Sequence, residues 1–391
     1  MVASMRIAIV VPEFPPNIIG GGGIVYEALS RRLQVRHAVR VFTADDPSRS
    51  WFHPRSTSRF AQELDVLRYP LLPIFRNESS LRTVLPPNPR AGWDLWQDLR
   101  KWAPDVAHVH GIGYTFVDFV SLSLRRLGVP YLLTDHGLPA SFIDRSSFVR
   151  KGYRTYHDLV LKRTVLGAGR VTAVSSQEAE LCARTFATDV LTIPNGVTPL
   201  PFDQGTASVD SIDIPDRPYL AAAGRIVPHK GFDILLEALL SNPGLPPCFI
   251  AGDWRVSDYG RALHERAGTR LRFVGPLSRQ NLNSLFTHAA AVVVPSRSEP
   301  FGLVGFEALS ANVRVVATRT GGLFDFANEQ TPVLLVDPGN HQELADAIIR
   351  TLAMGPISNS EQTACEAMLM RLNWSDITAS YEEQLILLIQ K

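Results

Sequence analysis

Cysteine is scarce in this sequence, and the three cysteines present, Cys182, Cys248 and Cys365, lie far apart along the chain. Thiols this few and this scattered exclude a zinc cage and a disulfide framework. They also favour a reducing compartment. We therefore expect a cytoplasmic protein.

Excess charge and long apolar runs are also missing. The 39 Lys and Arg residues stand against 38 Asp and Glu, for a formal net charge of +1, which gives no electrostatic reason to expect a nucleic-acid-binding protein. Runs of about eighteen or more apolar residues, which a membrane-spanning helix needs, do not occur. The apolar run at residues 5–12 is too short for a secretory signal and predicts a buried first strand.

The length and the periodicity of the chain predict its architecture. Its 391 residues, 45% of them hydrophobic, exceed what one core usually serves, so we expect two domains and a cleft. Short β-branched runs alternate with stretches of helical period, and this series occurs twice. The pattern predicts an α/β fold of two Rossmann-like domains with parallel sheets facing a central cleft.

Residues 193–218 interrupt the series with frequent proline and glycine, which predicts a linker. We expect a first domain at residues 1–200, a second at 201–373, and a helix at 374–391 that crosses back to the first. The expected strands are 7–11, 39–43, 106–110, 131–134, 171–174 and 190–193, then 220–223, 249–251, 271–274, 291–294, 314–317 and 333–336.

Two segments of the first half are candidates for contact with a second substrate or a surface. Residues 46–89 are rich in Pro, Ser and Arg and predict an insertion longer than most connections. Residues 144–163 carry six Lys or Arg and two Asp, which suits an anionic membrane surface or a phosphorylated ligand. A solvated basic helix face explains the same charges.

Four consecutive glycines follow the first expected strand and open a helix expected at 24–33. Gly20, Gly21 and Gly22 would leave backbone N–H groups and a helix N-terminus open to a phosphate. A tight strand-to-helix turn explains the cluster equally, since it lacks the spaced dinucleotide pattern and the Lys-Ser/Thr of a P-loop.

Arg225 and Lys230 lie between the first strand and the first helix of the second half, where ligands of open α/β sheets bind. Two cations there suit a diphosphate, because they make charge-assisted hydrogen bonds to it and neutralise the charge that develops when it leaves. This reduces the need for a metal. Solvated surface cations are the alternative.

Two carboxylates, Glu299 and Glu307, follow the strand expected before them. Glu307 falls inside a helix among apolar residues, where it needs bonding partners, and a ribose diol would supply two hydroxyl donors. Glu299 stands in the loop, where it and the N–H groups of Phe301, Gly302 and Leu303 can reach sugar hydroxyls. An acid at a helix N-terminus with a solvated neighbour is the alternative.

With these motifs the sequence resembles the retaining glycosyltransferases of the GT-B fold, in particular glycosyltransferase family 4. Gly224-Arg225 and Lys230-Gly231 match the family's Gly-Arg and Lys-Gly pattern, and Glu299 to Glu307 matches its Glu-x7-Glu pattern. The resemblance covers nearly the whole chain. It implies a metal-independent enzyme that moves a sugar, with retention, from a nucleotide-diphosphate sugar to an acceptor hydroxyl, without a further cofactor.

The resemblance also implies roles for individual residues. Arg225 and Lys230 would bind the donor diphosphate, Glu307 the ribose and Glu299 the donor sugar. His136 would face the donor sugar near the reaction centre, whereas without the resemblance it reads as a strand-end histidine. We count His136, Arg225, Lys230 and Glu299 as the candidate catalytic residues.

His108 and His110 alternate with apolar residues along the strand expected at 106–110, and we interpret them as structural. Their spacing also suits a metal, but no neighbouring Cys or carboxylate pair completes a site.

Two other functions fit such a fold. A non-catalytic nucleotide-sugar sensor or scaffold would be expected to lose part of the set Arg225, Lys230, Glu299 and Glu307, which is complete here. A nucleotide-sugar epimerase or a phosphorylase would keep the fold and change the reaction, although phosphorylases carry a pyridoxal lysine in a much longer chain. The base and sugar of the donor, and the acceptor, stay open.

Overall fold

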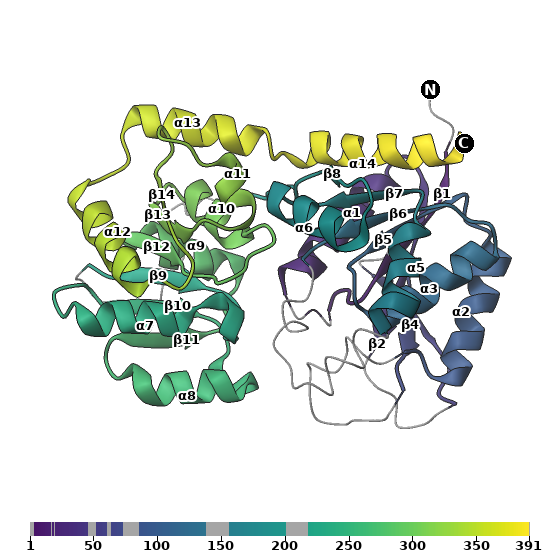
Figure 1. The fold of residues 1–391 in the computed structure, drawn as a ribbon, viewed down its shortest axis with the longest axis horizontal. Helices are drawn as coiled ribbons and strands as arrows, with labels where there is room; N and C mark the ends of the chain where they lie inside the picture. Colours follow the sequence, from purple (N-terminus) through teal and green to yellow (C-terminus); the bar gives the residue numbers. More distant parts are fainter. Residues whose placement is uncertain are drawn as a thin grey trace. The chain divides into compact units, whose positions relative to one another are not determined.

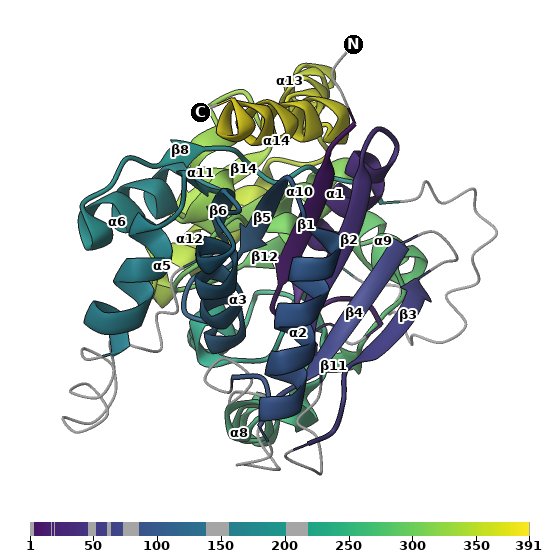
Figure 2. The ribbon, with the colours of Figure 1, turned by 90° about the vertical axis from the view of Figure 1, so that its right-hand side faces the viewer.

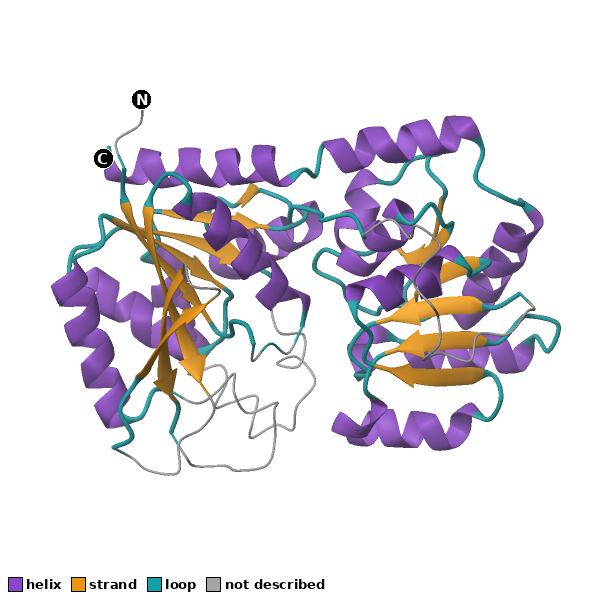
Figure 3. Cartoon of the chain, turned by 180° about the vertical axis from the view of Figure 1, so that it is seen from behind, coloured by secondary structure: helices purple, strands orange, loops and turns teal. Residues whose placement is uncertain are grey.

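The structure, a computed structural model, describes residues 4–16, 18, 20–45, 52–60, 64–72, 86–137, 156–200 and 218–390. The chain divides into two compact units, one made of Met1–Asn195 with Trp374–Lys391 and the other of Gly196–Asn373. Each unit holds one largely or wholly parallel sheet with helices packed on it (Figure 1; Figure 3). The predicted pair of Rossmann-like α/β domains is confirmed.

The sheet of the first unit has eight strands in the order β3-β4-β2-β1-β5-β6-β7-β8. Neighbouring strands pair in parallel, except β3 and β4, which are antiparallel. The strands are β1 (Arg6–Val11), β2 (Ala38–Asp45), β3 (Ser56–Phe60), β4 (Leu64–Pro70), β5 (Val106–His110), β6 (Tyr131–Asp135), β7 (Arg170–Ala173) and β8 (Leu191–Thr192). The helices are α1 (Gly21–Gln34), α2 (Pro89–Trp102), α3 (Thr115–Arg126), the π-helical turn η3 (His157–Leu161), α5 (Lys162–Leu166), α6 (Ser176–Phe186) and α14 (Trp374–Ile389).

Strands β3 and β4 correct one expectation, because they lie within residues 46–89, which we expected to be an insertion. Strand β4 continues the parallel sheet beside β2. A buried arginine obscured it in the sequence: Arg68 is 6% exposed and donates to the carbonyl oxygens of Phe14 and Pro15. A charged side chain is costly inside a protein unless it is bonded in this way, so it interrupts the apolar pattern of a strand. Residues 46–51, 61–63 and 73–85 lie outside the described part.

The last helix, α14, packs within the first unit against α1, β5 and β6 (Figure 2). The Arg32 guanidinium of α1 lies 4.9 Å from the ring centroid of Trp374, at the start of α14. Farther along the helix, the Tyr381 hydroxyl donates to the carbonyl oxygen of Ile193 over 3.3 Å. The end of the chain therefore covers part of the first sheet.

The sheet of the second unit has six parallel strands in the order β11-β10-β9-β12-β13-β14. Strands β9 and β12 are neighbours in space but not in sequence, which makes them the point where the strand order reverses. The strands are β9 (Leu220–Ala223), β10 (Cys248–Ala251), β11 (Leu271–Gly275), β12 (Ala291–Val294), β13 (Val315–Thr318) and β14 (Val333–Val336). The helices are η4 (Pro228–Lys230), α7 (Phe232–Ser241), η5 (Trp254–Val256), α8 (Asp258–Ala267), α9 (Arg279–Thr287), α10 (Leu303–Ser310), α11 (Gly321–Phe326), α12 (His341–Ala353) and α13 (Asn359–Met370).

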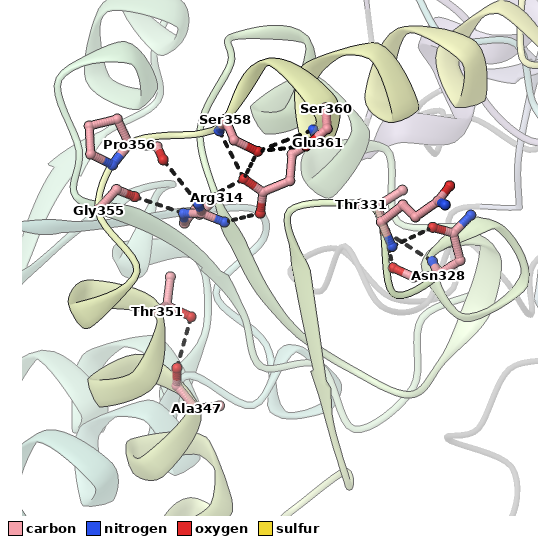
Figure 4. Close-up of polar contacts among 11 residues, drawn as sticks. Arg314, Asn328, Thr331, Ala347, Thr351, Gly355, Pro356, Ser358, Ser360 and Glu361 are labelled. Atoms are coloured by element: carbon pink, nitrogen blue, oxygen red, sulfur yellow. Dashed lines mark hydrogen bonds and ion pairs between the residues drawn. The ribbon is translucent and has the colours of Figure 1, made fainter.

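One buried arginine holds α13 to the second sheet (Figure 4). Arg314, directly before β13, makes two hydrogen bonds to the Glu361 carboxylate, of 2.6 and 3.0 Å. It also donates to the carbonyl oxygens of Gly355 and Pro356. Glu361 in turn closes a capping box with Ser358 at the N-terminus of α13.

Two other expectations concern the surface and the thiols. Within the described ranges, no helix is long and apolar enough to cross a membrane. Cys182, Cys248 and Cys365 are free and buried. Of the basic segment at residues 144–163, residues 144–155 lie outside the described part.

Candidate active site

The candidate donor-binding residues of the second unit follow two adjacent strands. Arg225 and Lys230 come after β9, and Glu299, Phe301 and Gly302 come after β12. Because β9 and β12 are parallel neighbours, their carboxyl ends lie at the same edge of the sheet. Open α/β sheets bind their ligands at this edge, where the strand order reverses. The two motifs are therefore close in space.

Lys230 and Glu299 form a direct ion pair between these loops. The Lys230 Nζ lies 2.5 Å from Glu299 Oε2, and the two side chains are 18% and 13% exposed. Burial raises the pKa of Glu299, but the charge of Lys230 and the hydrogen bonds from Lys230 and Ser296 outweigh it and hold the pKa below its ordinary value. Glu299 is therefore an ionised acceptor beside a cation.

Arg297 ties the same two loops together through backbone and side chain. Its N–H donates to the carbonyl oxygen of His229 over 2.8 Å, and its guanidinium makes a bidentate pair with Asp233 at 2.7 and 2.6 Å. It also donates to the Pro228 carbonyl oxygen over 2.8 Å. Bidentate pairs of this kind fix geometry as well as charge. Arg297 thus sets where Lys230 stands relative to Glu299.

Arg225 differs from Lys230, because its side chain is exposed. Its guanidinium makes no hydrogen bond or ion pair with any other residue that the structure describes. Burial and the charges of Lys230 and Arg225 lower the pKa of nearby His229 to about 4. His229 is therefore neutral at neutral pH, and Arg225 is a cation available to an anion from outside the chain.

Glu307 has a protein partner that the sequence did not suggest. Arg279 Nη1 lies 2.7 Å from Glu307 Oε1, and Arg279 Nη2 donates to the Thr198 carbonyl oxygen over 2.7 Å. Burial raises the pKa of Glu307, and the charge and hydrogen bond of Arg279 oppose that rise. Arg279 begins α9, where a half-buried arginine carries no recognisable pattern. Oε1 is occupied, while Oε2 has no hydrogen-bond partner within the described residues.

Free backbone donors lie at the N-terminus of α10. Phe301, Gly302 and Leu303 donate no hydrogen bond from their N–H groups to the described chain. Gly302 has φ +90° there, a conformation that favours glycine. The Phe301 ring stacks on the Phe306 ring, with the two ring centroids 4.9 Å apart, and this contact holds the turn in place. The N–H groups that the sequence predicts as ligand donors therefore have no acceptor among the described residues.

His136 lies in the first unit, directly after β6. Its Nε2 is 2.9 Å from Nδ1 of His110, at the end of the neighbouring strand β5. Burial lowers the pKa of His136 to about 3 and that of His110 well below its ordinary value, so both rings are neutral at neutral pH. We interpreted His110 as structural, and the alternation along β5 gave no signal that it bonds a candidate catalytic residue.

The glycine cluster also lies in the first unit, and the helix that follows it begins earlier than the expected residue 24. Helix α1 already begins at Gly21, so three of the four glycines are helical. A Cβ at Gly23 would lie 2.2 Å from Ile18 Cγ2, and one at Gly22 would lie 2.9 Å from the Tyr26 hydroxyl. The Gly20 N–H donates to Glu13 Oε1 over 3.3 Å. Packing therefore accounts for Gly22 and Gly23 without a phosphate.

The histidines do not gather with carboxylates as metal ligands. In the part of the chain that the structure describes, no group of three His, Cys, Asp or Glu side chains could hold a metal ion. His108 bonds Thr134 Oγ1 at 2.7 Å instead.

Comparison with protein families identifies both halves of the chain. The Glycosyltransferase Family 4 model matches residues 19–199, and the model described as glycosyl transferases group 1 matches residues 207–365. An uncharacterized glycosyltransferase of Methanocaldococcus jannaschii is 26% identical over 89% of this chain and 89% of its own. A 2-deoxystreptamine N-acetyl-D-glucosaminyltransferase of Streptomyces fradiae is 31% identical over 63% of this chain and 62% of its own.

Solved structures share the whole fold. Sucrose-phosphate synthase from Thermosynechococcus elongatus has a TM-score of 0.76 at 24% identity, over 97% of this chain and 98% of that one. The catalytic domain of starch synthase IV from Arabidopsis thaliana has a TM-score of 0.71 at 15% identity, over the full length of both. The two parallel-sheet units thus define a GT-B fold. The chain belongs to the GT-B glycosyltransferases of the family 4 type.

Proposed function

We propose that this chain is a retaining glycosyltransferase that moves a sugar from a nucleotide-diphosphate sugar to a hydroxyl group of an acceptor. The observation that carries the proposal is the pairing of Lys230 with Glu299 at one sheet edge, beside Arg225, whose guanidinium has no partner among the described residues. Solved relatives support the donor class: Anabaena HepE was determined with UDP and glucose, and starch synthase IV with ADP and acarbose.

The candidate residues of the second unit each have a part in the proposed site. Arg225 and Lys230 bind the diphosphate, and the free N–H groups of Phe301, Gly302 and Leu303 add donors to it or to the sugar. Glu299 accepts from hydroxyls of the donor sugar. Glu307 accepts from the ribose through its Oε2 atom, because Oε1 is bonded to Arg279.

The proposed reaction needs no protein base. The bond from the anomeric carbon to the diphosphate oxygen breaks, and a bond to the acceptor oxygen forms on the same face. The acceptor proton passes to the diphosphate oxygen that leaves. Catalysis then rests on positioning and on the cations that stabilise the leaving diphosphate. Retention is tested by the anomeric configuration of the product, and metal independence by turnover in the presence of EDTA.

The first experiment identifies the nucleotide. Thermal unfolding is measured with UDP, GDP, ADP and dTDP for the wild type, Lys230→Ala and Glu307→Gln. A ligand at a hundred times its dissociation constant adds about 2.7 kcal/mol. Arg266→Ala and Glu237→Gln are the matched controls, because this pair joins α8 to α7 away from the strand ends. We expect one nucleotide to stabilise the wild type and both controls but neither site variant.

The outcomes separate the alternatives. Stabilisation that both site variants lose supports the donor site and names its base. If no nucleotide stabilises the protein, the proposal fails. A protein that binds the nucleotide but neither transfers nor hydrolyses the sugar is a scaffold, and one that changes the configuration of the sugar while it stays on the nucleotide is an epimerase.

We further propose a cytoplasmic location, with peripheral contact to an anionic membrane surface through the basic residues at 144–163. The proposal rests on the six Lys or Arg in that segment. Flotation with liposomes of neutral and anionic lipid tests it. Binding to anionic liposomes that salt reverses supports the contact, and an equal absence of binding to both kinds contradicts it.

A further inference from the structure

A row of histidines and hydroxyls lies on one face of the first sheet. His108 and His110 are two residues apart on β5, so their side chains lie on the same face of the sheet. Their ring centroids are 3.9 Å apart. His110 bonds His136, and His108 bonds Thr134, which lies 2.8 Å from the Thr172 hydroxyl. The row therefore ends at a candidate catalytic residue.

Aromatic rings fix the row from two helices. Tyr26 of α1 has its ring centroid 5.0 Å from that of His110 and 5.1 Å from that of His136. The ring centroid of Tyr381, on α14, lies 4.8 Å from the ring centroid of His108. His108 and His110 are 0% exposed, so their rings cannot turn without displacing these neighbours. Packing therefore fixes the planes of the rings. The bonds to Thr134 and His136 fix which edge of each ring faces its partner, because a flipped ring would present a carbon atom instead.

Each of the two buried rings has one nitrogen without a partner. These are Nδ1 of His108 and Nε2 of His110, neither of which has a hydrogen bond to any described residue. A neutral imidazole carries one proton, so one nitrogen donates and the other accepts. Proteins rarely bury an unpaired N–H, whereas an underused acceptor is tolerated more often. The proton of each ring is therefore expected on the nitrogen that is bonded.

For His110 the bonded nitrogen is Nδ1, which faces His136 Nε2. If His136 donated instead, the His110 proton would have to sit on Nε2, where it would be buried and unpaired. With the proton on His110 Nδ1, the His136 Nε2 atom accepts. The proton of neutral His136 is then on Nδ1, which has no partner within the described part of the chain and belongs to a half-buried side chain.

We propose that His110 is a positioning residue that holds His136 in the tautomer protonated at Nδ1, so that His136 presents an N–H donor to its ligand. The ligand atom that fits is an oxygen with a free lone pair, such as a sugar hydroxyl or a diphosphate oxygen. The identity of this ligand rests on the proposed function. The tautomer itself is a property of the free protein.

The test is a two-bond proton–nitrogen correlation spectrum of the whole protein labelled with nitrogen-15 histidine. Protonated and bare ring nitrogens resonate far apart, so the spectrum distinguishes both neutral tautomers and the charged ring. The protein has ten histidines, and His136→Gln assigns the signal of interest. His264, whose ring stacks on Trp254 in the second unit, is the internal reference.

We expect wild-type His136 at neutral pH to show a proton on Nδ1 and none on Nε2. In His110→Phe the bond is lost, and His136 becomes a mixture of tautomers. In His110→Asn the pattern returns, because the Asn amide nitrogen is as many bonds from Cβ as Nδ1 of His. A His136 signal protonated at Nε2, averaged or charged in the wild type overturns the proposal, even if the variants fail to fold.

Turnover gives a second measurement once the donor is known. One hydrogen bond is worth about fivefold, so His110→Phe should lower kcat by about that factor with little change in KM, and His110→Asn should restore it. Equal kcat in the two variants contradicts the positioning role. If no donor is turned over, the proposed function fails, while the tautomer result still stands or falls on the spectrum.

Discussion

Gly231 lies directly against the backbone of Pro295, so that a Cβ at residue 231 would come within 2.0 Å of the Pro295 carbonyl oxygen. This contact joins the loop that carries Lys230 to the loop that carries Glu299. Gly231 also has φ +66°, in the left-handed region that favours glycine. The ion pair at the candidate site therefore depends on a residue with no side chain.

We predict that Gly231→Ala destabilises the protein by about 3 kcal/mol or more, because it adds a backbone clash to an unfavourable φ. Gly339→Ala, in the same unit, is the matched control. Its φ is +85°, in a turn closed by the Asn340 N–H and the Asp337 carbonyl oxygen, but nothing lies within 4 Å of the added Cβ, so about 1 kcal/mol is expected. Urea unfolding measures both. Equal losses would mean that the Pro295 contact carries no energy.

We predict that Lys230→Ala lowers turnover by about 100- to 1,000-fold, the usual cost of removing one donor from a preorganised charged site. The variant also leaves Glu299, 13% exposed, without its cation, so the pKa of that carboxyl should rise. Steady-state kinetics with the donor found by thermal unfolding checks the first effect. Arg266→Ala, which breaks an exposed pair, should keep full turnover, and near-normal turnover of Lys230→Ala would remove Lys230 from the mechanism.

Much of the fold could be predicted because the β-branched runs are bounded by turn residues. The strands expected at 106–110, 220–223, 291–294 and 333–336 begin and end where the structure has them. Strands β3 and β4 escaped because a buried arginine interrupts the apolar pattern of β4. Its partners, the carbonyl oxygens of Phe14 and Pro15, are far away in sequence, and no local pattern announces them.

The sequence predicted which residues make up the candidate site but not the contacts among them. Spacing and strand ends indicated Lys230 and Glu299, whose pairing follows from the order of strands in the sheet. Arg279, Arg297 and His110 were missed, since each acts through a partner on another element and has no pattern of its own. Long-range hydrogen bonds of this kind require the three-dimensional structure.

We predict that the Arg314–Glu361 pair makes stability depend on acid pH. The hydrogen bond from Arg314, with those from Ser358, lowers the pKa of Glu361 to about 2 against an ordinary value of 4.5. A lowered carboxyl pKa stabilises the fold above the unfolded value, and that contribution is lost as the pH falls from about 4.5 towards 2. Glu361→Gln should therefore cost about 1 kcal/mol at pH 7 and less at pH 3.

Chemical unfolding of the wild type and Glu361→Gln between pH 3 and pH 7 measures this difference. Glu366→Gln is the control, because Glu366 is an exposed acid on the same helix and should cost little at any pH. A Glu361→Gln deficit that stays constant over this range would show that the carboxylate charge does not hold α13 in place.

The last prediction concerns Arg279 and Glu307, which form a 2.7 Å pair in which Glu307 is only 12% exposed. Arg279→Ala should cost about 1–3 kcal/mol, because it removes a charged hydrogen bond from a largely buried acceptor. Glu307→Gln should cost less, since a neutral amide oxygen still accepts from Arg279. The double variant should be more stable than the sum of the single losses predicts, by about 1 kcal/mol.

The pH dependence of the Arg279→Ala loss gives a sharper test. Burial already raises the pKa of Glu307, and removing Arg279 raises it further. A carboxyl whose folded pKa is raised stabilises the fold below its unfolded value and loses that contribution as the pH rises. The deficit of Arg279→Ala relative to wild type should therefore be larger at pH 8 than at pH 5, and this increase should vanish in the Glu307→Gln background. Equal deficits at both pH values, together with additive single losses, would mean that Arg279 contributes through Thr198 alone and leaves Glu307 free for both ribose hydroxyls.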